Sequence, residues 1–339
     1  MESYLGEKGA KWQEHQRRRA SVLFGFDKRR GKVVSGMAIR TRSAAHRLRE
    51  LLTQEGLVQI PGIHDPFSAR VAQDMGFEAV ALGGGVTLAI GYHVVPDMTM
   101  VSTRDVVEAA RGITRAIDIP LVADFDDGGG NPLQVRHAVQ LAEAAGIAGV
   151  MIEDTNFAYP KHSPPKELGT LMQFKDNHHL SREAAVQRIR AAVEARRNPD
   201  TVIIARTDAA LISKEESLIR MRLLAEAGAD VIKPTHFPFE DAAEAVEASG
   251  RPVMMVPIRL GSSTRQEREL ARHSGVKVLL EPVPVSYAVY GAVITALTEL
   301  KGGGTSEVDS DTVKLVQETI RYPEWGDLAA RYQGSVALP

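Results

Sequence analysis

The chain has no cysteine among its 339 residues. Disulfides, thiolate metal sites and a cysteine acting as nucleophile or acid are therefore excluded. No apolar run reaches the roughly 18 residues that a membrane-spanning helix needs, and no apolar segment typical of a secretory signal stands near the N-terminus. A net charge of −2 offers no general attraction to nucleic acid or to an anionic membrane. We expect a cytoplasmic protein that acts on a small molecule, with no nucleic-acid or membrane partner.

What the chain does have is a repeated pairing of helical and apolar segments. Hydrophobic residues make up 44% of the sequence, which is ample for a large core. Four times a helical stretch ends in a glycine before an apolar strand, and glycine just past a helix favours the left-handed turn that ends it. With four further apolar segments, this pattern predicts eight strands, at residues 56–61, 78–82, 120–124, 149–152, 201–206, 230–232, 252–257 and 277–280.

Eight short strands that alternate with helices over about 230 residues predict a (β/α)₈ barrel. Alternation alone would also fit a doubly wound parallel sheet. The positions of the polar residues favour the barrel, because they gather at the carboxyl ends of strands, where barrel enzymes hold their active sites. These residues include Asp124, Asp126, Glu153, Asp154, Arg206, Asp208, Thr235, His236, Arg259 and Glu281.

The composition divides the chain into three predicted regions. Residues 1–42 form an N-terminal extension that mixes glycine with basic residues, and residues 43–301 form the catalytic barrel. Residues 302–339 begin with a Gly/Ser/Asp linker. They continue into a C-terminal helical segment, with an amphipathic helix expected at residues 310–321.

The most informative stretch is the strand end at residues 121–127, where Asp124 and Asp126 follow an apolar run and three glycines come next. Alternate residues of a strand face the same side. Two carboxylates on one side repel each other unless a cation or a proton lies between them. A hard cation such as Mg²⁺ is held by one or two carboxylates together with waters and substrate oxygens. An acidic, solvated strand end is the alternative interpretation of this pair alone.

Four motifs extend this pattern along the chain. The first is Pro-Gly-Ile-His-Asp-Pro-Phe-Ser-Ala-Arg at residues 61–70, and the second is Asp-Phe-Asp-Asp-Gly-Gly-Gly-Asn at residues 124–131. Ile-Glu-Asp at residues 152–154 and Ala-Arg-Thr-Asp-Ala at residues 205–209 follow. In this order, over about residues 48–300, the sequence resembles the isocitrate lyase/phosphoenolpyruvate mutase superfamily. The resemblance implies a barrel enzyme that acts on a small oxo- or hydroxy-carboxylic acid through an enolate.

The same resemblance implies a metal site. Asp124 would bind Mg²⁺ directly, with Mn²⁺ as an alternative ion, and Asp126 and Glu153 would hold it through waters. Asp97 matches a further acid that, in the superfamily, completes the ring of carboxylates around the metal ion. An enolate is a localised negative charge, and a metal ion with a nearby guanidinium can stabilise it by several kcal/mol in a dry site.

The substrate contacts are implied in the same way. The backbone amides of Gly83, Gly84 and Gly85 would bind the substrate carboxylate, and Arg206 would lie near the developing oxyanion. An ion pair between Arg206 and a neighbouring acid is the structural alternative. Near the end of the sixth strand, Thr235 replaces the glutamate of the lyases, with His236 next to it. Both are expected to contact the substrate.

The loop after the fourth strand departs from the lyases of the superfamily, which carry a cysteine there as the expected general acid. The candidates in this chain are Lys161, His162 and Ser163. One alignment places Ser163 at the cysteine position and another places Lys161 there. A serine of ordinary pKa is a poor acid, whereas a lysine or histidine can donate a proton if its pKa is tuned.

These observations predict a Mg²⁺-dependent lyase or decarboxylase that cleaves a C–C bond of a small oxo- or hydroxy-acid. The first alternative is a P–C bond mutase or hydrolase that acts on a phosphonopyruvate-like substrate. An alternative of another class is a catalytically silent protein that binds a carboxylate. Members of the superfamily exchange their C-terminal barrel helix between subunits, so we expect a homo-oligomer, dimer or tetramer, swapped through residues 285–300.

Overall fold

A computed structural model describes residues 42–94, 100–156, 162–163, 173–174, 178–259, 261–304 and 308–333. The chain divides into two units, one of Met1–Thr41 with Tyr290–Glu307 and one of Arg42–Val289 with Val308–Pro339. All the strands that the structure describes belong to the second unit. The predicted region boundaries after residues 42 and 301 stay predictions.

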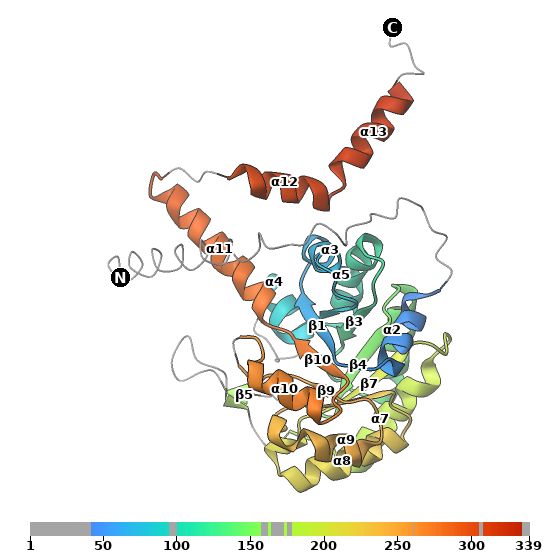
Figure 1. The fold of residues 1–339 in the computed structure, drawn as a ribbon. Coiled ribbons are helices and arrows are strands. Elements are labelled where there is room, and N and C mark those ends of the chain that lie inside the picture. The colour runs from blue at the N-terminus through green and yellow to red at the C-terminus, as the bar shows by residue number, and fades with distance from the viewer. Residues whose placement is uncertain are drawn as a thin grey trace. The chain divides into compact units, whose positions relative to one another are not determined.

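Eight parallel strands form a nearly closed ring in the second unit, in the order β8-β7-β4-β3-β2-β1-β10-β9 (Figure 1). A single parallel bridge between Ile232 and Val253 links β8 to the start of β9 at the two ends of this order. The strands are β1 (Val58–Ile63), β2 (Val80–Leu82), β3 (Leu121–Asp124), β4 (Gly149–Glu153), β7 (Val202–Thr207), β8 (Val231–Pro234), β9 (Met254–Met255) and β10 (Val278–Glu281). The predicted barrel is confirmed, and each strand lies where the apolar segments placed it.

Helices follow the strands and surround the ring (Figure 1). They are α3 (Pro66–Asp74), α4 (Ala89–Gly91), α5 (Thr103–Ala116), α6 (Pro132–Ala144), α7 (Arg182–Ala195), α8 (Lys214–Glu226), α9 (Ala242–Ser249) and α10 (Arg265–His273). Local chemistry sets their starts, since side chains of Asp65, Ser102 and Thr264 accept a backbone N–H in the first turn of α3, α5 and α10. Two of the glycines expected to end helices, Gly146 and Gly228, have φ of 79° and 100°.

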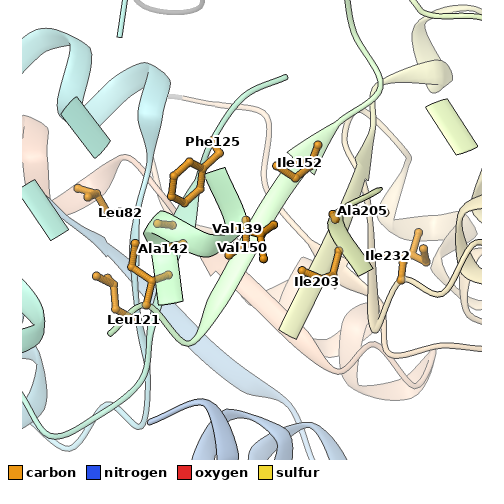
Figure 2. Packing of buried hydrophobic residues seen from close by; sticks show 14 of the residues in the cluster. Leu82, Leu121, Phe125, Val139, Ala142, Val150, Ile152, Ile203, Ala205 and Ile232 are labelled. Atoms are coloured by element: carbon orange, nitrogen blue, oxygen red, sulfur yellow. The ribbon is translucent and has the colours of Figure 1, made fainter. Parts of the chain in front are cut away.

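The core has two layers on either side of the strands. The outer layer lies between strands and helices, and Figure 2 shows part of it, with Val139 and Ala142 of α6 near Val150 of β4. The inner layer fills the barrel and also contains Leu48 and Leu51 of α2 (Ala44–Thr53). Burying a leucine side chain stabilises a fold by about 1.5–3 kcal/mol. Helix α2 therefore seals the N-terminal end of the barrel, and the open end is the C-terminal one.

Three helices follow the barrel. Helix α11 (Pro284–Lys301) runs from the second unit into the first at Tyr290, and α12 (Ser310–Thr319) and α13 (Tyr322–Gln333) come after it. The helix expected at residues 310–321 is confirmed as α12. Within the described ranges, every helix is too short or too polar to cross a membrane.

Candidate functional site

Four polar side chains near the ends of barrel strands point into the barrel at its C-terminal face. Asp124 and Glu153 are the last residues of β3 and β4. Arg206 and Lys233 are the last but one of β7 and β8. Side chains two residues apart on a strand face the same way. The residues two positions before these four all belong to the inner layer, namely Val122, Met151, Ile204 and Val231.

The Arg206 guanidinium joins three carboxylates at this face. Its Nε and Nη2 atoms each donate to Asp208, at 2.9 Å to Oδ1 and 2.9 Å to Oδ2. Its Nη1 atom lies 2.9 Å from Glu153 Oε2 and 3.5 Å from Asp124 Oδ2. The ion pair with Asp208, which was the structural alternative for Arg206, is therefore present together with contacts to two predicted metal residues.

Burial shapes the titration of this cluster. It raises the pKa of the Asp124 carboxyl, and the negative charge of Glu153 raises it further, while the charge of Arg206 acts in the opposite direction. For Arg206, burial works to lower the pKa, but the charges of Asp208, Glu153 and Asp124 outweigh it and leave the pKa well above its ordinary value. The acids thus hold Arg206 in its charged form, and their mutual repulsion is only partly relieved.

Asp126 lies in a turn that brings the second acid of the pair next to the glycine segment after β2. Its φ is 49°, a left-handed conformation that is uncommon for residues other than glycine. Its backbone N–H donates to Asp124 Oδ1 at 3.1 Å, and its carbonyl accepts from the Glu153 N–H at 2.9 Å. A Cβ atom on Gly84 would lie only 3.1 Å from Asp126 Oδ1. The turn therefore ties three predicted site residues together through backbone and carboxylate contacts.

The glycines after β2 begin a short helical segment. Gly83 precedes a π-helical turn, Gly84–Leu88, which contains Gly85 and continues directly into α4. The first N–H groups of a helix have no intrahelical acceptor and can bind anions. Because Gly84 is close to the Asp124 carbonyl, 3.2 Å from where its Cβ would be, this turn adjoins the acidic cluster.

Arg188 of α7 is a component of the site that sequence reasoning missed. The Arg188 Nη1 atom donates to the carbonyls of Glu153 and Thr155, both at 2.8 Å, and its Nη2 atom donates to the carbonyl of Gly130 at 3.1 Å. Its side chain is buried, and burial lowers its pKa. Arg188 therefore fixes the end of β4 against the glycine turn after β3. An arginine within a charged helix sequence carries no local signal of this role.

A second buried arginine, Arg220, contacts the residues next to this region. Arg220 donates to Asp154 Oδ2 at 3.0 Å and to the Leu180 carbonyl at 2.7 Å. Asp154 also accepts from the Thr207 hydroxyl at 2.7 Å. Although Asp154 stands next to Glu153 in the sequence, it serves this structural network, because neighbouring residues of a strand point to opposite faces.

The remaining predicted residues are placed unevenly. Thr235 is buried after β8, and its hydroxyl accepts from Lys233 Nζ at 2.8 Å. His236 follows with a φ of 64°. Asp97 and Lys161 lie outside the described residues. The backbone of His162–Ser163 forms strand β5, which pairs antiparallel with β6 (Gln173–Phe174). The structure does not describe the side chains of His162 and Ser163.

The cluster has the chemistry of a cation site without a preformed metal geometry. Among the described residues, no group of three or more His, Asp or Glu side chains converges on a point that could hold a metal ion. Instead, Asp124 and Glu153 contact the guanidinium of Arg206. The donors are carboxylate oxygens, which hard divalent ions prefer. Burial, and after it the charge of Glu153, raises the pKa of Asp124, so a cation beside these carboxylates would be favoured and the donor set fits such an ion.

Comparisons with known proteins agree with this architecture. The family of phosphoenolpyruvate phosphomutase matches residues 48–300. An oxaloacetate decarboxylase of Pseudomonas entomophila (strain L48) is 34% identical over 280 residues, which cover 81% of this chain and 91% of that protein.

Two solved structures are similar over most of their length. Oxaloacetate acetylhydrolase in complex with the inhibitor 3,3-difluorooxalacetate has a TM-score of 0.73 and 29% identity, and the match covers 87% of this chain and 99% of that one. Phosphonopyruvate hydrolase in complex with oxalate and Mg²⁺ has a TM-score of 0.69 and 27% identity, over 86% of this chain and 100% of that one.

Proposed function

The chain belongs to the phosphoenolpyruvate mutase/isocitrate lyase superfamily, and on that premise we propose that it is a Mg²⁺-dependent lyase or decarboxylase. It cleaves a C–C bond of a small oxo- or hydroxy-carboxylic acid and passes through an enolate. The observation that carries this proposal is the buried group of Asp124, Glu153 and Arg206 at the open end of the barrel. The similarity to oxaloacetate decarboxylases favours C–C chemistry.

In this proposal, Asp124 contacts Mg²⁺, and Asp126 and Glu153 hold it through waters, with Asp97 as the expected fourth acid. A bound divalent ion supplies positive charge for the enolate oxygen. Mn²⁺ has similar ligand preferences and is the alternative ion. Arg188 supports the ring from behind, because it fixes the backbone of Glu153 and of Gly130.

The other groups bind and orient the substrate. The amides of the Gly83–Gly85 segment bind its carboxylate, and Arg206 adds positive charge beside the oxyanion. Asp208 holds the guanidinium by two hydrogen bonds, which fixes its plane. Thr235 and His236 line the side of the site next to β8. A rigid guanidinium requires little reorganisation when negative charge develops on the substrate.

Lys161, His162 and Ser163 remain the candidates for the proton donor to the enolate. They belong to the long connection between β4 and α7, whose base is fixed on both sides. The Thr155 carbonyl accepts from Arg188, and the Leu180 carbonyl accepts from Arg220. The single substitutions K161M, H162N and S163A test the three candidates. For each variant, the rate of bond cleavage and the rate at which the enolate is protonated are measured separately. The donor is the residue whose substitution slows protonation and leaves cleavage unchanged.

We also propose that the enzyme is a homo-oligomer, dimer or tetramer, that exchanges α11 between subunits in the cytoplasm. Helix α11 carries six large apolar side chains that are exposed, with exposed fractions from 37% at Val289 to 65% at Ile294. The others are Tyr287, Val293, Leu297 and Leu300. Such a surface on a helix suits burial against another chain. A monomer by multi-angle light scattering would contradict this expectation.

The test of the reaction is a substrate panel followed by proton and phosphorus NMR, with Mg²⁺ and with EDTA. Oxaloacetate and 2-alkylmalates probe C–C cleavage, and phosphonopyruvate probes P–C cleavage. We expect metal-dependent pyruvate or a second carbonyl product from the first group. A shifted phosphorus signal with phosphonopyruvate would instead favour the P–C alternative. The similarity to phosphonopyruvate hydrolase supports this alternative. Failure to bind both Mg²⁺ and oxalate would favour the catalytically silent alternative.

A further inference from the structure

The strand ends that carry the acidic cluster also have a side that faces away from the barrel interior. Glu153 of β4 pairs in register with Arg206 of β7, and both side chains point inward. The residue that follows each of them, Asp154 and Thr207, therefore points outward. Both are buried, and the Thr207 hydroxyl donates to Asp154 Oδ2 at 2.7 Å. An outward polar pair thus lies behind the inward pair that we assign to the chemistry.

Asp154 holds three consecutive residues at the end of β7. Its backbone N–H donates to the Arg206 carbonyl at 3.2 Å. Its carboxylate accepts from the Thr207 hydroxyl and, through Oδ1, from the Asp208 N–H at 3.3 Å. The stretch that carries Arg206 and its partner Asp208 is therefore attached to the end of β4 by three hydrogen bonds of a single residue.

A buried arginine fixes the Asp154 carboxylate in turn. Arg220 of α8 is 5% exposed, and its Nη1 atom donates to Asp154 Oδ2 at 3.0 Å. A buried ion pair is stable only when its geometry is good and its remaining lone pairs accept further hydrogen bonds. Thr207 and Asp208 supply those donors, so the end of β7 and the ion pair are held in one arrangement.

This arrangement sets the place of the Arg206 guanidinium. Its Nε and Nη2 atoms donate to the two oxygens of Asp208, so the plane of the guanidinium follows the Asp208 carboxylate. The backbone of Asp208 is held by Asp154. A displacement of about 1 Å in a group near the reacting atoms can cost about 100-fold in rate, so the support of Arg206 has a measurable consequence.

We propose that Asp154 and Thr207 are positioning residues that hold Arg206, through Asp208, where the oxyanion of the enolate develops. This inference rests on the proposed function and adds to it two residues that touch neither the metal nor the substrate. Arg206 acts on charge that develops during the reaction. Its displacement should therefore lower kcat and leave KM nearly unchanged.

The experiment compares two substitutions of Thr207 that differ in the hydroxyl. T207V removes the hydrogen bond to Asp154 and nearly preserves the side-chain volume. With the substrate that the wild-type enzyme cleaves, we expect kcat of T207V to fall by about 10-fold and KM to change by less than about twofold. T207S keeps the hydroxyl and should retain most of the wild-type kcat.

Substitution of the acid itself should have a larger effect. In D154N the amide NH₂ faces a donor in either orientation, which is the Asp208 N–H in one and the Thr207 hydroxyl with Arg220 in the other. We expect kcat to fall by about 100-fold. If D154N does not fold, the comparison of T207V with T207S still decides the inference.

D230N is the matched control at the sealed end of the barrel. Asp230 also accepts from an arginine, Arg196, at 2.7 Å, and from a backbone N–H of β7, that of Ile203, at 2.8 Å. D230N should therefore destabilise the fold in urea unfolding as a lost ion pair does, but it should leave kcat and KM unchanged.

A spectroscopic measurement reports the position of Arg206 without turnover. The Arg206 Nε–H donates to Asp208 and gives a ¹⁵N–¹H signal that is identified by its absence in R206K. We expect T207V to shift this signal and to speed its exchange with solvent. T207S and D230N should leave the signal in place.

Two outcomes would overturn the inference. One is a T207V protein with wild-type kcat and an unchanged Arg206 signal. The other is an equal loss of kcat in T207V and D230N, which would make the loss a consequence of stability alone. A wild-type protein that neither cleaves a substrate of the panel nor binds oxalate with Mg²⁺ overturns the proposed function instead. The Arg206 signal of T207V then still decides whether Asp154 and Thr207 hold the arginine.

Discussion

The two ends of the barrel hold their charged side chains in different ways, partly exposed at one end and buried at the other. At the sealed N-terminal end, Asp230 is shared by Arg49 at 3.1 Å and Arg196 at 2.7 Å, and Asp200 lies near Arg49 and His46. At the open C-terminal end, the single guanidinium of Arg206 serves three carboxylates. Two arginines share one carboxylate at the first end, whereas three carboxylates share one guanidinium at the second.

We infer from this difference that the charges at the N-terminal end stabilise the fold and that the acids at the C-terminal end bind a ligand. A paired carboxylate within a hydrogen-bonded network needs no further cation. A buried excess of acids raises the free energy of the folded state, and a divalent ion would lower it again.

The largest expected effect comes from removing the central cation at the open end. R206M leaves Asp124, Glu153 and Asp208 buried together without the guanidinium, and we expect the free energy of unfolding to fall by about 3–5 kcal/mol. R196M at the sealed end should cost only about 1–3 kcal/mol, because Arg49 still contacts Asp230. Urea unfolding measures both. An equal loss of unfolding free energy in R206M and R196M would contradict the proposed difference between the two ends.

The second prediction concerns the close approach of Gly84 to the acids. G84A places a Cβ 3.1 Å from Asp126 Oδ1 and 3.2 Å from the Asp124 carbonyl, so the turn must shift. We expect a loss of about 10- to 100-fold in kcat/KM, as for small displacements of reacting groups, and weaker Mg²⁺ binding. Gly91 is the matched control, since a Cβ there has no atom within 4 Å. G91A with the same loss would show that the helix, and not the contact, matters.

A third prediction concerns the raised pKa of Asp124 at the open end. Asp124 has a raised pKa, so between its ordinary pKa and the raised one the folded protein holds a proton that the unfolded chain has released. Its contribution is therefore unfavourable at neutral pH and disappears as the pH falls below the ordinary value. D124N without metal should raise the free energy of unfolding by about 1 kcal/mol at pH 7, while D230N should lower it.

The metal dependence of D124N gives the complementary measurement. Mg²⁺ should raise the Tm of the wild-type protein, since an ion that binds only the folded state stabilises it. The Tm of D124N should respond little to Mg²⁺. A metal-independent wild-type Tm, together with a D124N protein less stable than wild type in EDTA, would contradict the assignment of Asp124 to a metal site.

The smallest effect is expected at Glu216, which contacts two arginines near the open end. A hydrogen bond from Arg182, reinforced by Arg220, lowers the pKa of Glu216 from 4.5 to about 2. The stability that it contributes is present above pH 4.5 and is lost as the pH falls through about 2. E216Q should therefore cost within about 1 kcal/mol at pH 7 and nothing near pH 2. Thermal unfolding across this interval checks it, and a pH-independent difference would contradict it.

Much of the fold followed from local sequence patterns. The eight apolar segments and the glycines that end helices predicted the strands of the barrel. The polar residues at the strand ends predicted that Asp124, Glu153 and Arg206 would lie at the same end of the barrel. The role of Arg188 could not be derived in this way. Arg188 lies 58 residues from Gly130, whose carbonyl it holds, and no local pattern carries such a contact.

The sequence by itself determined the order of strands and helices, the acids at strand ends and the absence of a cysteine acid, because these depend on residue type and on periods of two or 3.6 residues. Only the tertiary structure decided which charges meet. The contact of Arg206 with Asp124 spans 82 residues of sequence, and the sealing of one barrel end by α2 depends on packing against distant strands. Ring closure brings such residues together, and through it the ends of separate strands become one site in which three carboxylates contact one guanidinium.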